Sequence, residues 1–506
     1  RKASHAAMAG NTVKRKVHVL VVGAGPAGLL AAIKLLMRNG EKKAVDYSVE
    51  VVEGSEDFGS LEEAGVEKKR SWMIGLSHHG LTALKSVPGL YEDYVSKVGV
   101  KVDGAVIYVG STKIVAKDEN PNNFVVDRNY IVRAIARFLN DKFKETGKLS
   151  MRYNTRVNFV DGDKKRVFVT NSETGMDEYL PYDLLLGCDG VRSAVRAALV
   201  AKHRDFECSV SDIFAKFKAA HLDVDQLLHK GVPIEPNLSH VFPGAPPKFN
   251  GIALVETGGK INVNMGFHKN HETEIPQEVF SEDPKVVAQF FRDHFKPFTL
   301  PYDDLANQWV KQQWSTTGMV HCNFYHSLKM SLIIMGDAAH ATSPAIGQGM
   351  NTALADALAF DELLDKHGDD LQKVLPAFSE ERVKEGNALS ALSLHAYSLS
   401  PSQQFCLILA SMVRMFLHGY FPSLVAIDPL VAIGKGEKLS KVYNDLTHMG
   451  RLPAVRTVFE KIQRRHFEKT TGMVIGDPDK RSTFWIIGAL FAVSAAAAAT
   501  AFAVSA

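Results

Sequence analysis

The chain has 506 residues, about three times the length of a typical domain, which excludes one small binding module and predicts two or more cooperating units. Hydrophobic residues make up 46% and charged residues 23%, which excludes a disordered, collagen-like or polytopic membrane chain. A net charge of +3 argues against nucleic acid as the main partner. Four cysteines without a CxxC pair predict no metal site and a fold independent of disulfides.

The two ends of the chain differ from the middle. The first forty residues carry nine Lys, Arg or His and no acid, which favours a basic leader remnant over residues 1–15, with a simple chain boundary as the alternative. Residues 482–506 contain no charged side chain. A helix of that length is roughly 37 Å long and can cross a hydrocarbon core of about 30 Å. We therefore expect a transmembrane anchor; the alternative is an Ala-rich helix that docks on the protein.

A glycine-rich turn follows the first strand signal. Residues 17–22 are a β-branched apolar run typical of a buried parallel strand, and residues 29–38 have the pattern of a helix. Between them stands Gly23-Ala24-Gly25-Pro26-Ala27-Gly28, a GxGxxG motif in the context that binds a pyrophosphate at a helix N-terminus. The next strand ends in Glu53, an acid placed for ribose hydroxyls. The motif predicts a dinucleotide site and leaves NAD, NADP and FAD open.

Two later strands also end in polar turns. The strand over 181–188 closes on Asp189-Gly190 and is followed by Arg196, although Asp-Gly alone can be a simple turn. The strand over 331–335 ends in Gly336-Asp337, which can bind a ribose hydroxyl. His340 is expected to be structural or solvent-facing rather than a general base. A loop follows whose backbone N–H groups can approach an electron-rich carbonyl or an anion; its candidate binding residues are Pro344, Gly347, Gln348, Gly349, Met350 and Asn351.

Together these segments resemble the flavoprotein aromatic hydroxylases, the single-component FAD monooxygenases, and within that family the kynurenine hydroxylases. The run RSWMIGLSHHG that begins at Arg70 is similar to the stretch after the family's second strand, and so is GQGMN at 347–351. The resemblance covers residues 15–470. It is weaker in 208–314, where the family builds its substrate sheet.

The resemblance implies an α/β fold: a Rossmann-like FAD-binding domain interleaved with a mostly antiparallel substrate sheet, a helical C-terminal region and one C-terminal transmembrane helix. The implied parts are, in order, FAD-binding residues 16–90, 126–205 and 326–385, substrate residues 91–125 and 206–325, a helical region at 386–480, and the anchor. The apolar stretches 403–417 and 421–433 are expected to be helices, either core or against the bilayer.

The resemblance also implies how FAD lies. The GxGxxG glycines would meet the pyrophosphate, Glu53 the adenosine ribose and Asp337 the ribityl or pyrophosphate region, while the 347–351 loop would lie against the isoalloxazine. Arg70 and Arg128 would be further FAD contacts. Asp189, Gly190 and Arg196 belong to the motif that the family uses for both FAD and NADPH.

The implied chemistry belongs to the cofactor. NADPH would be a transient reductant, and O₂ would form a flavin C4a-hydroperoxide that passes one oxygen atom to an aromatic or unsaturated small-molecule substrate. Protein groups would position the substrate and exclude water, so we name no catalytic residue. The resemblance favours an organelle membrane, mitochondrial first and plastid as the alternative; protein partners are not implied.

Two departures from the family bear on specificity. Glu53 is followed by Gly54 rather than by Arg or Lys. The stretch 100–109 lacks the arginine with which kynurenine-using members grip the substrate carboxylate, and Asp103 there would repel one. Lys101 offers a displaced cation, and Tyr397 matches a family position near the substrate amino-acid group. We therefore expect a kynurenine-hydroxylase-like enzyme with another substrate. The alternatives are an epoxidase or hydroxylase of a membrane-borne isoprenoid or quinone, and a flavin-binding subunit without turnover.

Overall fold

The structure, a computed structural model, describes residues 14–40, 44–67, 69, 71–109, 112–117, 124–223, 237–242, 249–295, 300–396, 412–423 and 425–448. The expected anchor, Arg70 and Tyr397 lie outside these ranges, as does the expected leader except for its last two residues. Within the described ranges, no helix combines the length and the apolar character needed to cross a membrane.

A six-stranded sheet forms the centre of the first domain. Its strand order is β18-β19-β12-β1-β2-β8, and all neighbouring pairs except β18 with β19 are parallel. The strands are β1 (Arg15–Val22), β2 (Val45–Val52), β8 (Leu149–Arg152), β12 (Leu184–Gly187), β18 (His326–Ser327) and β19 (Leu332–Ile334). Their apolar runs are buried because elements cover both faces of the sheet. The carboxyl ends of β1, β2, β12 and β19 therefore meet at one edge.

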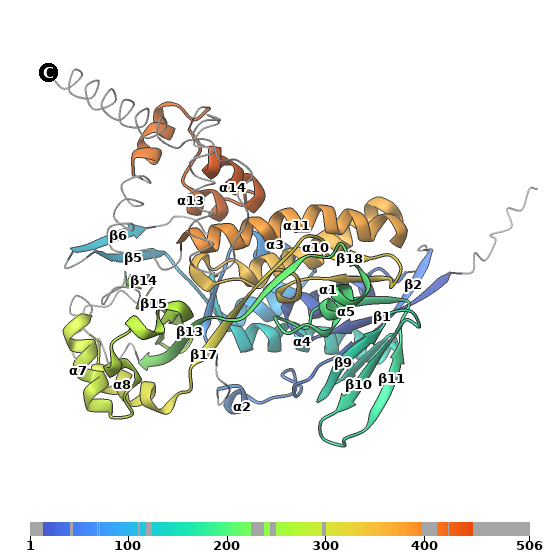
Figure 1. Ribbon diagram of the computed structural model, residues 1–506, viewed down its shortest axis with the longest axis horizontal. Helices are drawn as coiled ribbons and strands as arrows, with labels where there is room; N and C mark the ends of the chain where they lie inside the picture. The colour runs from blue at the N-terminus through green and yellow to red at the C-terminus, as the bar shows by residue number, and fades with distance from the viewer. Residues whose placement is uncertain are drawn as a thin grey trace, which may run out of the picture.

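Helices cover this sheet (Figure 1). α1 packs against α10 and α4, and α10 packs against α3 and α11. Arg38, which follows α1, forms ion pairs with Asp361, Asp365 and Asp369 of α10 and the turn after it, and this fixes one helix against the other. The helices of this domain are α1 (Pro26–Met37), α2 (Glu63–Glu67), α3 (His78–Lys85), α4 (Arg128–Phe143), α5 (Ala194–Lys202), α9 (Asp337–His340) and α10 (Gly349–His367), with short turns η1 (Tyr91–Val95), η2 (Ser96–Val98), η3 (Lys144–Thr146) and η6 (Pro344–Ile346).

Two three-stranded sheets flank the first domain. One consists of β9 (Thr155–Asp161), β10 (Arg166–Asn171) and β11 (Asp177–Pro181). The other consists of β3 (Met73–Leu76), β7 (Phe124–Asp127) and β4 (Gly99–Lys101). In this second sheet Val100 pairs with Val125. η1 and η2 contact α4 of the first domain, whereas β4 also contacts β15 (Asn250–Glu256) of the second.

A seven-stranded sheet forms the second domain, in the order β17-β13-β16-β15-β14-β5-β6. Every pair is antiparallel except β14 with β5, so the sheet is mostly antiparallel, as the family resemblance implies. One face packs on α7 and α8 around Phe249, Phe291 and Trp309. The elements are β5 (Gly104–Val109), β6 (Thr112–Lys117), β13 (Cys208–Asp223), β14 (Ser239–Phe242), β15 (Asn250–Glu256), β16 (Lys260–His268), η4 (Lys269–Glu274), η5 (Gln277–Phe280), α7 (Pro284–His294), α8 (Tyr302–Lys311) and β17 (Ser315–Cys322).

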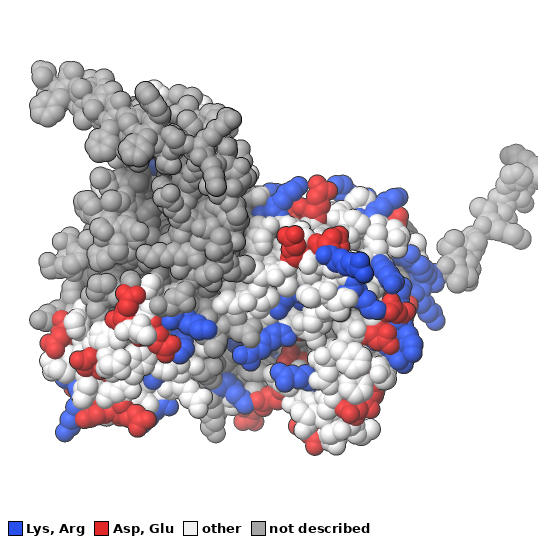
Figure 2. Space-filling view, viewed as in Figure 1, with Lys and Arg blue, Asp and Glu red and all other residues white. Residues whose placement is uncertain are grey.

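The described part of the C-terminal region is mostly helical, as predicted, although residues 421–423 and 425–428 form turns and irregular structure. α11 (Leu371–Ala396) runs without a break across the expected boundary at 385/386, and α13 (Pro429–Gly434) and α14 (Leu439–His448) pack near its end (Figure 1). Glu385 of α11 accepts a hydrogen bond from the backbone N–H of Leu439 at 2.8 Å. On the face of the described residues in Figure 2, acidic and basic side chains are interspersed, with no dominant sign.

Candidate active site

The glycine-rich turn adopts a geometry that only glycine allows at two positions. Gly23 has φ +99°, and a Cβ there would overlap the carbonyl oxygen of Cys188 on the neighbouring strand. A Cβ at Gly28 would overlap the carbonyl oxygen of Gly23, so α1 can approach the turn only with glycine at that position. Gly25, the N-cap of α1, differs because a Cβ there would meet nothing within 4 Å. The turn is thus closed toward the protein and open above Gly25.

The open side of the turn fits an anionic ligand. No side chain caps α1, and Pro26 occupies its first turn, where a missing N–H costs no helical hydrogen bond. Glu53 lies beside the turn, since its carboxylate accepts hydrogen bonds from the backbone N–H groups of Ala24 at 2.7 Å and Ser55 at 2.8 Å. The first motif and the strand-end acid are therefore in contact.

The Asp189-Gly190 motif lies at the end of β12, next to the glycine turn. One oxygen of Asp189, Oδ2, accepts hydrogen bonds from the backbone N–H groups of Ala194 and Val195 at the start of α5. The other, Oδ1, is buried and has no partner in the described part of the chain. Burial raises the pKa of this carboxyl group. A buried acceptor without a partner beside a glycine turn is what a bound hydroxyl group would satisfy.

Arg196 joins two of the predicted motifs. Its guanidinium is buried and donates hydrogen bonds to the carbonyl oxygens of Ala338 at 2.8 Å and of Val191. The first carbonyl belongs to the Gly336-Asp337 segment and the second follows Gly190. In this arrangement Arg196 holds the second and third motifs together through their backbones.

The third motif places an acid at the same edge of the sheet. Gly336 has φ +60°, and Asp337 begins α9 with an exposed side chain. The loop that follows turns at Pro344 and at Gly347, whose φ is +65°. Asp337 is therefore presented to solvent at the end of β19, on the side where the other strand ends meet.

The GQGMN loop is fastened to the stretch that follows Arg70. Asn351 is fully buried; its Oδ1 accepts from the backbone N–H of Ser77 at 2.8 Å, and its Nδ2 donates to the carbonyls of Gly75 at 2.9 Å and Gly347 at 3.0 Å. The hydroxyl of Ser77 donates to Gln348 at 2.8 Å. The two stretches that carry the family resemblance are thus one structural unit, in which Gln348 and Asn351 serve the loop itself.

Arg128 lies at the start of α4 with an exposed side chain. Its guanidinium is 4.8 Å from the ring centroid of Trp72, and the Trp72 ring contacts Phe217 of the seven-stranded sheet edge-on at 5.2 Å. Asp127 caps the helix by accepting from the backbone N–H of Asn129 at 2.8 Å. Arg128 therefore stands where the two domains meet.

Sequence reasoning missed a buried ion cluster behind the third motif. His340 is structural, as expected, but it is buried and lies 2.6 Å from Asp356, which also accepts from Arg382 at 2.6 Å and from the backbone N–H of Gly336 at 2.8 Å. Burial opposes ionisation of Asp356, but the cations His340 and Arg382 outweigh it and lower its pKa to about 2. Positions 340, 356 and 382 are far apart in sequence, so no local pattern reveals this cluster.

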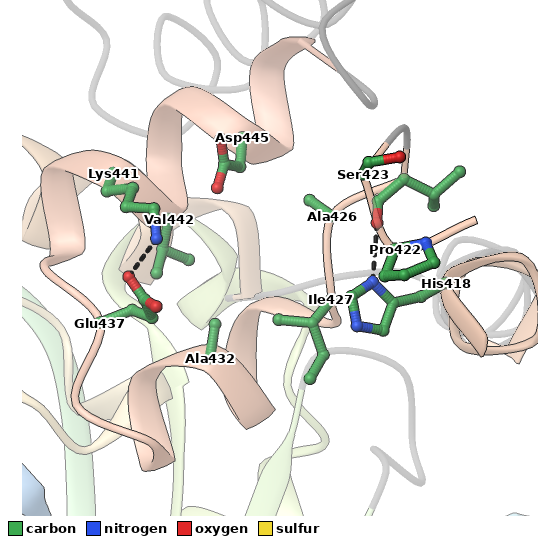
Figure 3. Close-up of a pocket in the computed structure, with 11 residues that line it drawn as sticks. His418, Pro422, Ser423, Ala426, Ile427, Ala432, Glu437, Lys441, Val442 and Asp445 are labelled. Atoms are coloured by element: carbon green, nitrogen blue, oxygen red, sulfur yellow. Dashed lines mark hydrogen bonds and ion pairs between the residues drawn. The ribbon is translucent and has the colours of Figure 1, made fainter. Parts of the chain in front are cut away.

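Figure 3 shows a pocket in the C-terminal region, which reaches the RSWMIGLSHHG stretch where the carbonyl oxygen of Glu437 lies 3.0 Å from Nε2 of His79. Its wall includes His418, whose Nδ1 is 2.7 Å from the carbonyl of Val425, and the ion pair of Lys441 with Glu437. None of the residues predicted to bind FAD lines it. Elsewhere in the described residues, the three cysteines are free thiols, and no group of three or more His, Cys, Asp or Glu side chains is arranged to hold a metal.

Comparison with known proteins shows the family to which the chain belongs. The FAD binding domain family matches residues 16–390. The kynurenine 3-monooxygenase of Sus scrofa is 30% identical over 398 residues, which cover 76% of each protein. The violacein synthase of Chromobacterium violaceum is 26% identical over 451 residues, 88% of this chain and 99% of that protein. The solved structure of a variant of 2-methyl-3-hydroxypyridine-5-carboxylic acid oxygenase shares the fold, with a TM-score of 0.57, 18% identity, and coverage of 75% of this chain and 90% of that one.

The chain therefore belongs to the FAD-binding family of flavoprotein aromatic hydroxylases. It is an FAD-dependent monooxygenase similar to the kynurenine 3-monooxygenases. Its cofactor is FAD, and enzymes of this kind typically use NADPH and O₂. The open turn at Gly25, the unpartnered Oδ1 of Asp189 and the exposed Asp337 fit that cofactor.

The stretch in which kynurenine-using relatives are expected to carry a carboxylate-binding arginine forms β4 and β5 in this structure. Residues 99–109 of β4 and β5 contain no arginine, and Asp103 between them is exposed, with the ammonium of Lys101 3.9 Å away. An exposed pair at this distance contributes little binding energy. The ammonium group of Lys101, the cation that this stretch offers, therefore already lies beside the carboxylate of Asp103.

Proposed function

We propose that the protein uses NADPH and O₂ to insert one oxygen atom into an electron-rich aromatic or unsaturated small molecule. The single observation that carries this proposal is that the Gly25 turn, Asp189 and Asp337 follow the adjacent strands β1, β12 and β19. Gly23 packs on Cys188, and Gly336 lies against Ala353 of α10, the helix that begins in the GQGMN loop. Bound FAD would supply the oxygen chemistry after its reduction. The chain's own residues would bind, orient and shield the reactants.

We assign the cofactor-binding roles as the sequence suggests. The backbone of the 23–28 turn would bind the pyrophosphate at the start of α1, and Glu53 the adenosine ribose. Asp337 and Asp189 would accept hydrogen bonds from hydroxyl groups of FAD. The loop held by Asn351 would lie against the isoalloxazine, with Arg128 as a cation near the flavin. Arg196 would contribute to NADPH binding only indirectly, by holding the backbone at Val191 and Ala338 in place.

The substrate is proposed to differ from kynurenine. Support comes from the absence of an arginine in residues 99–109 and from exposed Asp103, because an amino-acid carboxylate needs a cation that is not already paired. The test is a titration of the FAD-loaded protein with kynurenine, followed by the flavin difference spectrum and by product analysis. Weak or absent binding is expected; tight binding with turnover to the 3-hydroxy product would refute the altered specificity.

A membrane-borne isoprenoid or quinone is the second candidate substrate class. The observation in its favour is that the segment 412–421 exposes large apolar side chains beside the C-terminal pocket: Met412, Val413, Met415, Phe416, Tyr420 and Phe421. We propose that this segment lies against an organelle membrane, mitochondrial or plastid, with residues 482–506 as the anchor. Flotation of the full chain with vesicles, compared with a chain ending at residue 448, tests this placement. If the chain that ends at residue 448 floats with the vesicles as well as the full chain does, the role of residues 482–506 as an anchor is contradicted.

The reaction itself is tested on purified, FAD-loaded protein. NADPH oxidation is followed together with product mass for a panel of aromatic amines, aromatic amino acids and short-chain quinones. The proposal expects at least one compound that stimulates NADPH oxidation and gains one oxygen atom. Retained FAD with no response to any compound would favour the remaining reading, a flavin-binding subunit without turnover.

A further inference from the structure

A row of polar side chains crosses the inner face of the seven-stranded sheet. His221 on β13 is paired with Asn262 on β16, and Ala219 is paired with Asn264 two residues along, so both asparagines share the face of His221. Glu256 ends β15 on the same face, because Leu254 is paired with Asn262. The opposite face of these strands carries the apolar core under α7 and α8. The row is thus confined to the face turned toward the first domain.

The row is connected by short contacts. Nδ1 of His221 lies 2.8 Å from a carboxylate oxygen of Glu256, and Nδ2 of Asn262 lies 3.2 Å from the same ring nitrogen. Nδ2 of Asn264 donates to Oδ1 of Asn262 at 2.6 Å. Oδ1 of Asn264 is buried and has no partner in the described residues. The row therefore ends in an unsatisfied acceptor, while the His221 side chain at the other end is 36% exposed.

The row lies next to β3, the strand that is hydrogen-bonded to Asn351 of the GQGMN loop. The backbone N–H of Met73 on β3 donates to Oδ1 of Asn262 at 3.2 Å. Two residues further along β3, the carbonyl of Gly75 accepts from Asn351 of the loop at 2.9 Å. One short strand thus connects the polar row with the loop proposed to contact the flavin. A substrate between the sheet and the flavin would meet this row.

The charged groups near the row are His221, Glu256, Asp127, Lys260 and Arg128. His221 is already ion-paired with Glu256. Asp127, at the end of β7, adds a buried carboxyl group whose electrostatic field reaches both His221 and Glu256. Lys260 is exposed at the hairpin end, and Arg128 lies over Trp72. Oδ1 of Asn264 has no partner in the described residues, so a substrate carboxylate at that atom would lose its water next to another acceptor, whereas an N–H or O–H donor would satisfy it.

An ordinary structural network is the competing explanation for these residues. It accounts for Oδ1 of the fully buried Asn262, which accepts hydrogen bonds from Met73 and Asn264. It does not account for a buried amide oxygen without a partner, because native proteins seldom leave such an atom unsatisfied. The unsatisfied oxygen is the observation that points to a ligand.

We propose that His221, Glu256, Asn262 and Asn264 form the specificity-determining end of the substrate site, and that this end takes an aromatic substrate through an N–H or O–H donor group such as an amine, and rejects a carboxylate. Asn264 contacts the donor directly, and Glu256 is a positioning residue that orients His221. The inference rests on the proposed function and specifies its substrate class.

The test uses ligand pairs that differ only by one carboxyl group: kynurenine against its decarboxylated amine, and tryptophan against tryptamine. Binding to the full FAD-loaded chain is read from the flavin difference spectrum, which does not require turnover. We expect each amine to bind at least about 10-fold more tightly than its amino acid, the size of one hydrogen bond to a charged group. Tighter binding of the amino acids, or no binding of either amine, would overturn the proposal.

Variants separate specificity from folding. Asn264→Asp adds a carboxylate at the unsatisfied oxygen, so it should tighten amine binding and weaken amino-acid binding by about 3-fold or more each. Glu256→Gln should weaken amine binding by about 10-fold. The matched control is Glu272→Gln in the same domain, whose side chain pairs with Lys216 at 2.6 Å away from the row. FAD content and melting temperature are recorded for all three variants.

The results distinguish this inference from the proposed function. If both row variants retain FAD and change the affinities of amine and amino acid equally, or change neither, the row is structural and the inference fails while the proposed function stands. If the unsubstituted chain does not retain FAD, the proposed function itself fails. Should Glu256→Gln not fold, Asn264→Asp alone decides, because it keeps the side-chain shape.

Discussion

Asn351 and Ser77 lie 274 positions apart in sequence, yet the backbone N–H of Ser77 donates to Oδ1 of Asn351 at 2.8 Å. The Nδ2 atom of Asn351 donates hydrogen bonds to the carbonyl oxygens of Gly75 and Gly347. The relationship fastens the GQGMN loop to the end of β3 and fixes the shape of the surface proposed to contact the flavin.

Replacing Asn351 with Ala should loosen this surface. Three backbone groups would lose their buried partner, which costs on the order of 1–3 kcal/mol for each group left unsatisfied. We expect weaker FAD retention and a lower free energy of unfolding, measured by flavin release and by urea unfolding. The control is Asn158→Ala, an exposed position on β9. Unchanged FAD affinity in Asn351→Ala would contradict the role given to the loop.

Alanine at Gly25 and at Gly28 should have different effects. A Cβ at Gly28 overlaps the Gly23 carbonyl, so Gly28→Ala should destabilise the fold. A Cβ at Gly25 meets no protein atom within 4 Å, so Gly25→Ala should fold normally and bind FAD less tightly, because the methyl group occupies space above the turn. Thermal unfolding of apoprotein and FAD titration separate the two effects. Equal FAD affinity in Gly25→Ala and the unsubstituted chain would place the pyrophosphate elsewhere.

Arg196→Gln tests a residue predicted from sequence as a cofactor contact. Its guanidinium donates to the carbonyls of Val191 and Ala338 and is buried. Loss of these charge-assisted bonds should lower the free energy of unfolding by about 2–4 kcal/mol. The KM for NADPH should change by less than about 2-fold once FAD is saturating. A large rise in that KM with unchanged stability would instead show direct contact with NADPH.

The Asp356 cluster predicts an acid-dependent contribution to stability. The pKa of Asp356 is about 2 in the folded protein, below its ordinary value of 3.8. A lowered folded-state pKa stabilises the fold above the ordinary value, and this contribution is lost as pH falls from 3.8 toward 2. Asp356→Asn should cost about 3–5 kcal/mol at neutral pH because it leaves the buried guanidinium of Arg382 without its carboxylate partner. Urea unfolding against pH should show this difference narrowing in acid; a constant difference would count against the ionised cluster.

The sequence predicts much of the fold because strand, glycine turn and helix are local patterns. The strands that end at Gly23, Glu53, Asp189 and Gly336 were all predictable, since each apolar run is continuous and each turn has its own residue chemistry. What could not be predicted depends on contacts between distant residues. Arg196 was assigned to the cofactor because its motif is recognisable, whereas its burial against Ala338 is a tertiary property.

The proposed substrate site likewise depends on contacts between distant residues and could not be predicted from the sequence. His221, Glu256 and Asn262 stand in three different strands, and the register of β13, β15 and β16 alone brings them onto one face. A strand-by-strand reading predicts antiparallel pairs at 251–265 but does not give that register. Asp127 was also missed, although it directly precedes α4 and its side chain caps that helix, a role that aspartate often has at this position.

The most direct test of the central claim is turnover of the FAD-loaded chain with NADPH under ¹⁸O₂, with an aromatic amine such as tryptamine or the decarboxylated amine of kynurenine as substrate. The account predicts a product that carries one labelled oxygen atom, formed in proportion to the NADPH consumed. NADPH consumption without labelled product from any aromatic amine, phenol or quinone in the panel would contradict it.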